Sequence, residues 1–251
     1  MYVEDMYVAN KCSNCGDVLG IRQSRLQADP IKLLSLVDVL EPLSTEEINW
    51  LSQRTTERNF QGGDIVYLPG DASEIVYLLL AGSIRLYGMV GEQELTLDII
   101  RASTVFGVAS LMERTQDEYA VALEPSQVGL LSLNTFWHLM SQNAEVNARL
   151  VKLLGERLRL CRSRMKDIAL KEVPARLASL ILDLIQNEGV VTREGHYKIA
   201  THYTHEQLAT MIGTKRVAVT RAFGKLQDTE CVRLWRRQIY VVDLETLRRL
   251  A

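Results

Sequence analysis

Residues 204–226 read THEQLATMIGTKRVAVTRAFGKL, which is two amphipathic segments joined at Gly213. Thr204 can cap the first segment as a helix, because Gln207 stands three residues later and completes a capping box. Gly213 suits a tight turn, since a positive φ angle costs glycine little. Ala209 is small at the place where the two helices would approach each other. The stretch therefore predicts a helix-turn-helix.

The second helix of this motif has one apolar face and one polar, basic face. Val219, Phe223 and Leu226 make the apolar face, whereas Arg216 and Val217 stand at the start of the other. An arginine there can donate two hydrogen bonds to guanine, and a valine can contact a thymine methyl group. The DNA-binding residues predicted in this motif are Thr204, His205, Thr214, Lys215, Arg216, Val217, Thr220, Arg221 and Lys225. The alternative is an ordinary helical hairpin with a solvated basic face.

Residues 232–242 read VRLWRRQIYVV and predict a wing, two strands around a basic turn at Arg236 and Arg237. Such a turn contacts phosphates, which fix the register on DNA without reading bases. From residue 202 to residue 251 there are nine basic and five acidic residues, a net charge of +4, although the whole chain carries −2. The positive charge is thus concentrated beside the predicted helix-turn-helix, as in a sequence-specific DNA binder.

Upstream of this unit, short β-type runs alternate with glycine turns. Strands at such regular spacing predict a small antiparallel β-roll over residues 58–135. Ahead of it, Ser44 and Glu47 form a second capping box at the start of a short helix. We assign the aromatic side chains of Trp50, Tyr77 and Trp137 to the core of this part. The fold class is therefore α+β.

A long helix is predicted from about residue 141 to residue 170, because apolar residues recur at alternating spacings of three and four. They form a coiled-coil seam, which could pack on the chain's own β-roll, although pairing with a second copy of the chain is favoured. The residues predicted at this dimer interface are Val151, Leu154, Leu158, Cys161, Met165 and Ile168. Pro174 then starts a new helix and is a candidate hinge.

The predicted domains are an arm over residues 1–30, the β-roll over 31–140, the dimerisation helix over 141–170 and the winged helix-turn-helix over 171–251. With 251 residues, 47% hydrophobic and 24% charged, the composition is that of a globular protein. No apolar run approaches the ~18 residues that a membrane span needs, and the N-terminus has no signal-peptide core. We therefore expect a cytoplasmic protein without a membrane partner. No catalytic set stands out, so we expect no enzyme.

The whole layout resembles the Crp/Fnr superfamily of bacterial transcription factors, with a cyclic-nucleotide-binding-like β-roll (a double-stranded β-helix), a long dimerisation helix and a C-terminal winged helix-turn-helix. The resemblance covers residues 33–250 and is most specific in FQGGD (60–64), PGD (69–71), YLLLAG (77–82), VFG (105–107) and residues 204–226. The recognition helix and VFGVASL (105–111) look closest to the global nitrogen-control regulators of that superfamily.

This resemblance implies a homodimer that binds double-stranded DNA at a palindrome and contacts RNA polymerase. In the family's pattern the positions of Arg216, Val217 and Arg221 read the half-site. A valine at the middle position goes with GTA…TAC-type palindromes rather than TGTGA-type ones. Specificity is therefore expected from these three residues, and the phosphate contacts from the wing.

The resemblance also places an effector pocket at Phe106, Gly107, Val108 and Ala109. Cyclic-nucleotide members have a Phe-Gly-Glu turn there and an arginine downstream that holds the phosphate. Here Val108 replaces the glutamate, and Asp117 and Glu118 stand where that arginine is expected. We therefore expect no ordinary cyclic-AMP binding. For 2-oxoglutarate, the effector of the nitrogen-control members, the matching arginine is missing, and the arginines left to serve in its place are Arg114 and Arg85.

Cys12 and Cys15 have the spacing of half a zinc or iron–sulfur site. Either site needs about four ligands, so two chains would have to pool their thiols. The alternative is an arm that carries a reversible dithiol or inert thiols. A regulator of the same fold that senses redox state or a metal through Cys12 and Cys15 is therefore the alternative to one that works without an effector. No other cofactor is expected. Cys161, on the predicted seam, is either a small hydrophobic residue or half of a disulfide between chains.

Overall fold

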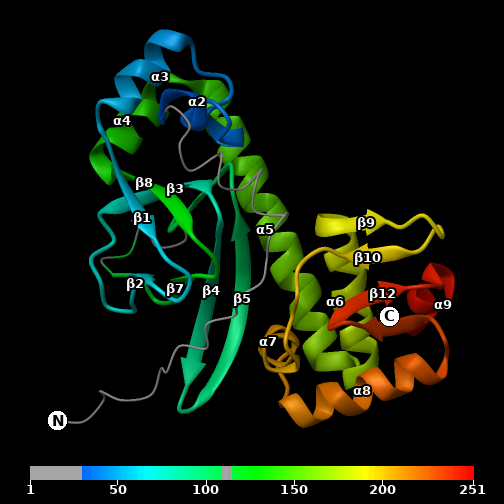
Figure 1. Cartoon of the computed structure of the whole chain (residues 1–251). Coiled ribbons are helices and arrows are strands. Elements are labelled where there is room, and N and C mark those ends of the chain that lie inside the picture. The colour runs from blue at the N-terminus through cyan, green and yellow to red at the C-terminus, as the bar shows by residue number, and fades with distance from the viewer. Residues whose placement is uncertain (1–29, 109–112, 114) are drawn as a thin grey trace.

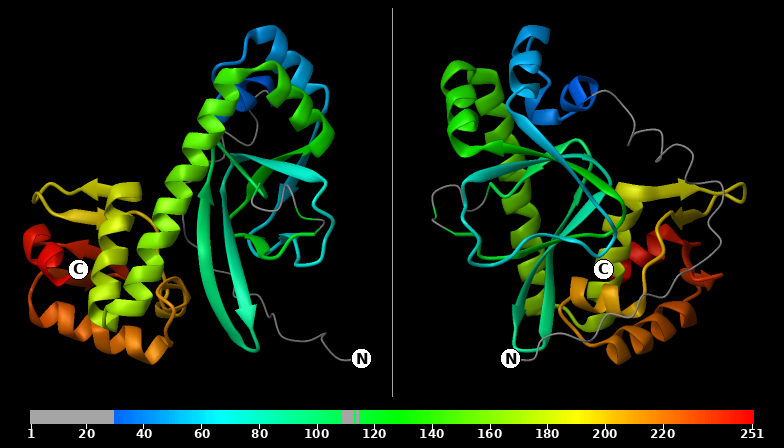
Figure 2. Two further views of the ribbon diagram at one scale, coloured as in Figure 1. Left: turned by 180° about the vertical axis from the view of Figure 1, so that it is seen from behind. Right: turned by 60° about the vertical axis from the view of Figure 1, so that its left-hand side comes forward.

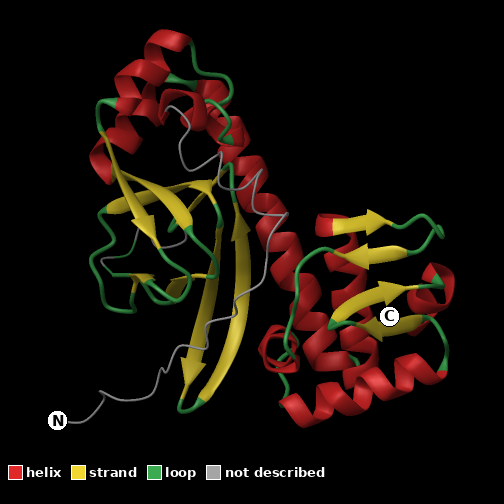
Figure 3. Cartoon of the chain, viewed as in Figure 1, coloured by secondary structure: helices red, strands yellow, loops and turns green. Residues whose placement is uncertain are grey.

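The computed structural model describes residues 30–108, 113 and 115–251 as a β-roll and a winged helix-turn-helix domain, joined by one long helix (Figure 1). A group of short helices covers one end of the β-roll (Figure 3). Before the long helix the elements are α2 (Pro30–Leu34), the 3-10 turn η1 (Asp38–Leu40), α3 (Thr45–Ser52), β1 (Thr55–Phe60), β2 (Ile65–Tyr67), β3 (Ile75–Ala81), β4 (Ser83–Val90), β5 (Gln93–Arg101), β6 (Thr104–Phe106), β7 (Tyr119–Ala122), β8 (Ser126–Ser132) and α4 (Leu133–Gln142). The long helix and the elements after it are α5 (Ala144–Leu170), α6 (Val173–Glu188), β9 (Gly189–Val191), β10 (Tyr197–Ile199), α7 (His205–Met211), α8 (Arg216–Asp228), β11 (Val232–Trp235), β12 (Gln238–Val241) and α9 (Leu244–Leu250). In the part of the chain that the structure describes, no helix is both long and apolar enough to cross a membrane.

The predicted β-roll is confirmed, as two four-stranded sheets with the strand orders β1-β8-β3-β6 and β2-β7-β4-β5. Strand β3 explains the uninterrupted apolar run of the sequence, because it is buried on both faces. Its alternate residues Val76, Leu78 and Leu80 pack against the short helices, while Tyr77 and Leu79 point into the roll. The uninterrupted apolar sequence of β3 is thus explained by its place between two hydrophobic cores.

Two glycines hold the β-roll's turns where no other residue fits. Gly82 has a φ angle of +88°, and a Cβ atom there would lie 2.2 Å from the hydroxyl oxygen of Ser126. Gly107 has a φ angle of +70°, and a Cβ atom there would lie 2.6 Å from the ring of Tyr77. Both positions combine a left-handed backbone with close packing, so a substitution would strain the turn twice over.

The helices at the end of the roll differ from the sequence prediction in two respects. The capping box of Ser44 and Glu47 is present, and Leu51 is fully buried. Residues 133–142, however, form the separate helix α4, so the long helix begins at 144 rather than near 141. The assignment of Trp137 to the core was wrong: α4 turns Phe136 inward and leaves Trp137 40% exposed.

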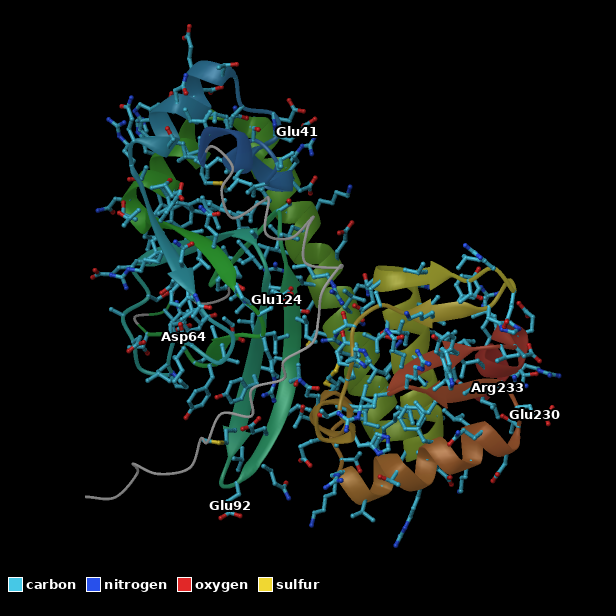
Figure 4. The ribbon with its side chains drawn as sticks, in the orientation of Figure 1. Glu41, Asp64, Glu92, Glu124, Glu230 and Arg233 are labelled. Atoms are coloured by element: carbon cyan, nitrogen blue, oxygen red, sulfur yellow. The ribbon has the colours of Figure 1, made fainter. Side chains whose placement is uncertain are left out.

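Helix α5 lies along the β-roll and is held to it by arginines on one face. Its start is fixed by Asn143, whose side chain accepts hydrogen bonds from the amides of residues 145 and 146. Arg149 forms ion pairs with Asp38 and with Glu41, which Figure 4 labels near the upper end of the helix. At 27 residues α5 is about 40 Å long, so it reaches from the short helices to the DNA-binding domain.

The C-terminal domain has its own core, built from α6, α7, α8, α9 and a four-stranded sheet of order β11-β12-β10-β9. Pro174 lies in the first turn of α6, and Gly189 ends that helix, as predicted. The hairpin of β9 and β10 extends the predicted wing into a larger sheet. Because this domain and the β-roll each bury a separate cluster, they are two folding units.

The two units touch where α7 rests on strand β5 (Figure 2). The hydroxyl oxygens of Thr96 and Thr210 lie 3.1 Å apart, and Thr96 is buried. Gly213 lies against the side chains of Leu95 and Ile168, so the turn of the helix-turn-helix faces both β5 and the end of α5. The position of the DNA-binding motif is thus defined relative to the β-roll of the same chain.

Candidate nucleic-acid interface

The helix-turn-helix has the geometry that its sequence predicts. Thr204 and Gln207 form a capping box at the start of α7, and Ala209 is completely buried between the two helices. Gly213 has a φ angle of +63°, and the amide of Thr214 then donates to the carbonyl of Ala209. The turn is therefore fixed by backbone contacts, and α8 leaves it in a defined direction.

Helix α8 buries one face and exposes the other. Its buried side chains are those of Val219, Phe223 and Leu226, together with Ala222. Val217 is 60% exposed although it is apolar, and it stands in the first turn. That turn carries no acidic side chain, so the positive end of the helix dipole adds to its basic residues. The predicted DNA contacts of the motif that are exposed are Thr204, Lys215, Arg216, Val217, Thr220, Arg221 and Lys225, whereas His205 and Thr214 are half-buried.

His205 is engaged within the motif. Its ring stacks on Phe223 with 5.1 Å between centroids, and its Nδ1 lies 2.8 Å from the hydroxyl oxygen of Thr220. The Thr220 hydroxyl oxygen also lies 3.2 Å from the carbonyl oxygen of Arg216, so this hydroxyl joins His205 to the first turn of α8. His205 and Thr220 were predicted as DNA contacts, and the structure shows them linking α7 to α8.

The wing turn forms at the two predicted arginines. Arg236 and Arg237 have φ angles of +48° and +64°, the left-handed pair that a two-residue hairpin turn requires. The guanidinium of Arg236 lies 4.5 Å from the ring centroid of Trp235, and the carbonyl of Arg237 lies 3.0 Å from Nδ1 of His202. Arg233, labelled in Figure 4, adds a further exposed base on β11. The turn thus presents a cluster of cations beyond α8.

Aromatic rings of the chain pack together at the predicted effector pocket. Tyr77 lies 5.1 Å from both Tyr67 and Phe106, measured between ring centroids, and all three rings are buried. Gly107 packs directly against Tyr77, and Val108 is buried as well. Ala109, the fourth predicted pocket residue, lies outside the described residues. The inside of the roll is thus an aromatic core at the place where an effector was expected.

Glu118 points toward this core. The hydroxyl of Tyr67 donates to its Oε1 at 2.9 Å. Burial raises the pKa of Glu118, whereas the hydrogen bond from Tyr67 and the charge of Arg157 lower it. Burial and the neighbouring Glu118 carboxylate also raise the pKa of Tyr67. An acidic residue therefore stands inside the roll, which is unfavourable for a phosphate or a carboxylate ligand.

Arg85 and Arg114 were the two arginines considered as ligands for an effector. Arg85 forms an ion pair with Glu94 at 2.8 Å, donates to the hydroxyl of Thr96, and lies over the ring of Tyr87. It is therefore committed to the β4–β5 hairpin. Arg114 lies outside the described residues.

Arg157 of α5 is not among the functional residues predicted from the sequence. Its Nη2 donates to the carbonyl of Val105 at 2.6 Å, and its Nε lies 3.9 Å from Oδ2 of Asp98. Burial lowers the pKa of its guanidinium, although Asp98 and Glu118 raise it. A signal for this placement exists in the sequence, because Arg157 follows Val146 and Leu150, both buried, at helical spacing.

The predicted dimer seam lies largely open on the single chain. Val151, Leu158 and Met165 are 69%, 61% and 63% exposed, and Leu154 and Cys161 are exposed too. The sixth residue, Ile168, is half-buried and lies close to Gly213 of the helix-turn-helix. An apolar stripe along a helix is rarely left in water, so this surface has the character of an interface.

Cys12 and Cys15 lie outside the described residues, so metal or cluster binding by the arm stays a prediction. The metal content of protein isolated without oxygen would test this prediction. Within the described part of the chain, no cluster of three or more His, Cys, Asp or Glu side chains is arranged to hold a metal ion.

Comparison with known domain families gives two matches. Residues 57–143 match the cyclic nucleotide-binding domain, and residues 175–250 match the Crp-like helix-turn-helix domain. The matches cover the β-roll and the C-terminal domain in the order seen in the structure.

Among individual proteins, the chain is 28% identical over 194 residues to the global nitrogen regulator of Nostoc sp., which covers 76% of this chain and 86% of that protein. It is 24% identical over 225 residues to the CRP-like cAMP-activated global transcriptional regulator of Mycobacterium tuberculosis, covering 88% of this chain and 99% of that one.

The fold is also that of solved structures. A CooA variant from Carboxydothermus hydrogenoformans superimposes with a TM-score of 0.73 at 21% identity, covering 85% of this chain and 94% of that one. A Crp/Fnr-family transcriptional regulator from Thermus thermophilus superimposes with a TM-score of 0.65 at 25% identity, over 78% and 98% of the two chains. With both domains matched in order and the recognition helix exposed, this chain belongs to the Crp/Fnr family of DNA-binding transcription regulators.

Proposed function

We propose that this protein is a homodimeric regulator that reads a palindromic GTA…TAC-like site, contacts RNA polymerase and works without ordinary cyclic-AMP binding. The observation that carries the proposal is the exposed face of α8, where Arg216, Val217 and Arg221 stand together. Among the described residues, neither guanidinium group has a hydrogen-bond or ion-pair partner. The relatives of this chain are transcription regulators, which agrees with this proposal.

The side chains of α8 support the reading of specific bases. Arg216 can donate two hydrogen bonds to guanine, and Val217 can contact the methyl group of the neighbouring thymine. Arg221 lies about one turn further along and can reach a second base or a phosphate. The apolar Val217 argues for a thymine, since 60% of it is exposed.

The stripe on α5 supports a dimer. Apolar residues at spacings of three and four over this length are typical of a two-stranded coiled coil. Two copies joined there would present two α8 helices, which matches the two halves of a palindrome.

The filled β-roll supports independence from cyclic AMP. A nucleotide would have to displace the packed rings of Tyr67, Tyr77 and Phe106 and place its phosphate near Glu118. Repulsion between the phosphate and the Glu118 carboxylate disfavours binding. The side chain of Val108 offers no hydrogen bond to a ribose.

Contact with RNA polymerase is supported by a groove of about 620 Å³ between the β9–β10 loop and the wing. It is lined by Trp235, Tyr240 and Arg233, among others, and Trp235 is 57% exposed. Tryptophan, tyrosine and arginine are the residues that dominate protein–protein interfaces. The groove adjoins the C-terminal end of α8, so a protein there leaves the first turn of α8 free for DNA.

The test is the affinity of reduced, effector-free protein for a GTA…TAC palindrome and for a scrambled duplex at physiological salt. We expect the palindrome to bind about a thousandfold more tightly. Added cyclic AMP should leave both affinities unchanged. Equal binding of the two duplexes, or selection of TGTGA half-sites from a random pool, would contradict the proposal.

A further inference from the structure

Besides the contact of α7 with β5, an ion pair joins the two folding units. It links the last residue of β5 to the last residue of α6, with 3.6 Å between Nη2 of Arg101 and Oε2 of Glu188. Arg101 belongs to the β-roll and Glu188 to the C-terminal domain. The C-terminal domain is thus attached to β5 at more than one point.

Glu188 is a charged residue in a buried position. Only 7% of its side chain is exposed, compared with 38% for Arg101. Within its own domain, the carboxylate accepts hydrogen bonds from the hydroxyls of Thr201 and Tyr203, the second at 2.7 Å. Burial and the bond to Glu188 raise the pKa of Tyr203 to about 12, so near neutral pH this hydroxyl keeps its proton and remains a donor.

The cation that compensates the buried charge comes from the other unit. Among the described residues, Arg101 is the only one that forms an ion pair with Glu188. A buried carboxylate that loses its cation is strongly unfavourable, whereas a fully exposed ion pair contributes little. Separation of the two units would take Arg101 away from Glu188, so the ion pair favours the docked arrangement.

The surroundings of Glu188 connect it to the DNA-binding motif. Its donor Tyr203 directly precedes Thr204, which caps α7. One residue earlier, Nδ1 of His202 lies 3.0 Å from the carbonyl oxygen of Arg237 in the wing. This short segment is therefore held by Glu188 and by the wing turn, so the position of Glu188 bears on both the start of α7 and the wing.

Two attachments to one strand define a direction. Thr96, which meets Thr210 near the end of α7, stands five residues before Arg101, a separation of roughly 15 Å along β5. A single contact would let the C-terminal domain pivot about it. The second contact, at the end of the strand, opposes this rotation. Because α8 leaves α7 through a fixed turn, its direction is then fixed as well.

We propose that Arg101 and Glu188 are positioning residues for DNA binding: their ion pair, together with the contact of Thr96 with Thr210, holds the C-terminal domain on the β-roll in the orientation in which α8 reads DNA. This inference rests on the effector-free reading of a palindrome proposed above. It goes further, because it names residues of the chain that keep the domain oriented when no effector is bound.

The decisive variant is Arg101→Met, which keeps a long side chain and removes its charge. We expect it to bind the GTA…TAC palindrome about tenfold more weakly than the wild type, a coupling of ordinary size between two parts of a protein. Its preference for one spacer length between the half-sites should weaken too. Its melting temperature should be unchanged, because each unit keeps its own core. Arg101→Lys restores the cation and should recover most of the affinity and of the spacer preference.

Glu188→Gln separates the loss of the ion pair from the effect of net charge on DNA binding. Arg101→Met removes a positive charge and Glu188→Gln a negative one, so attraction to phosphates alone would change the affinity in opposite directions. Loss of a shared contact instead weakens binding in both variants. The double variant should be no weaker than the weaker single variant, because both changes break one contact.

Arg58→Met is the matched control, since residue 58 is exposed on β1, in the other sheet of the roll. It loses the same charge as Arg101→Met and should keep the wild-type affinity and spacer preference. If Glu188→Gln melts at a lower temperature, Arg101→Met decides, because it changes no residue of the DNA-binding domain.

Hydrogen exchange in the absence of DNA keeps the inference apart from the proposed function. We expect faster exchange in α7 and β5 for both Arg101→Met and Glu188→Gln, and wild-type exchange for Arg101→Lys. Unchanged exchange in the first two variants overturns the inference, whether or not the wild type selects the palindrome.

If the wild type does select the palindrome, equal or tighter binding by both variants also overturns the inference, and the proposed function stands. If the wild type does not select it, the proposed function fails. Faster exchange that Arg101→Lys reverses would then still support the role of the ion pair in holding the domain on the roll.

Discussion

Arg216 and Arg236 are both exposed arginines of the DNA-binding domain, but they stand on different elements. Arg216 opens α8, where base edges are read, whereas Arg236 lies in the wing turn, where phosphates are contacted. Arg216→Ala should therefore cost about 1–3 kcal/mol of discrimination between sequences. Arg236→Ala should weaken binding to all duplexes alike and reduce the slope of log affinity against log salt by about one.

The measurement is a salt titration of each variant on the palindrome and on a scrambled duplex. Lys225→Ala serves as the phosphate-contact comparison on α8: it lies beyond the bases that the first turn can reach, so it should weaken binding to both duplexes alike. If the two arginine variants lose affinity and specificity in the same proportion, the division between base reading and phosphate contact is wrong.

The wing turn also stores backbone strain. Arg237 has a φ angle of +64°, a region that costs a residue with a Cβ about 1–2 kcal/mol. Arg237→Gly should therefore raise the free energy of unfolding, by up to about 1 kcal/mol. The same change should weaken DNA binding on every sequence, because a cation is lost. Urea denaturation with a parallel DNA titration checks both effects, and Arg237→Ala, which keeps the strain, is the matched control. A less stable Arg237→Gly protein would rule out this account of the turn.

Single residues of the helix-turn-helix could be predicted well, since capping boxes and turn glycines depend on neighbours in sequence. The partners of His205 and Tyr67 could not. His205 meets Thr220 because α7 packs on α8, and Tyr67 meets Glu118 across 51 residues of chain. Tyr67 also follows a register shift in β2, which local alternation does not reveal.

At the scale of one element, α5 offers the clearest test. Leu158→Glu places a charge in the middle of the exposed stripe, where a partner helix would have to bury it. We expect the chain to become monomeric at micromolar concentration and to lose selective binding to the palindrome. Sedimentation velocity measures the first effect and a binding titration the second.

Ser163→Glu is the matched control, because residue 163 is exposed on α5 but lies off the stripe. It should leave both the mass and the affinity unchanged. A Leu158→Glu protein that sediments like the wild type would mean that the stripe is not the dimer interface.

Elements were predictable where their pattern was unambiguous. The apolar run of β3 and the seam of α5 have clear periods, and both elements are found near the predicted positions. Helix α4 was missed because it follows β8 without a turn, although Ser132 and Thr135 give it a capping signal. The hairpin of β9 and β10 has strands of three residues each, too short for a period to show.

On the scale of the whole molecule, the contact between α7 and β5 fixes where the DNA-binding domain sits. Thr210→Arg should break this contact, because Thr96 is buried beneath it. Each domain keeps its own core, so we expect little loss of stability. We expect instead a broader tolerance for half-site spacing, measured as the affinity for palindromes whose spacer is one or two base pairs longer or shorter.

Thr210→Ser keeps the hydroxyl and should retain the wild-type preference for one spacer length. Were Thr210→Arg to keep the same preference, the docking of α7 on β5 would have no part in positioning the domain.

The stripe on α5 also affects how cells could control such a regulator. If two chains must meet before a palindrome is read, the amount of the active form follows the square of the chain concentration wherever single chains predominate. A doubling of synthesis would then raise the active form about fourfold. Gene expression and protein turnover would then act as the input, and the stripe would convert a gradual change in supply into a steeper response.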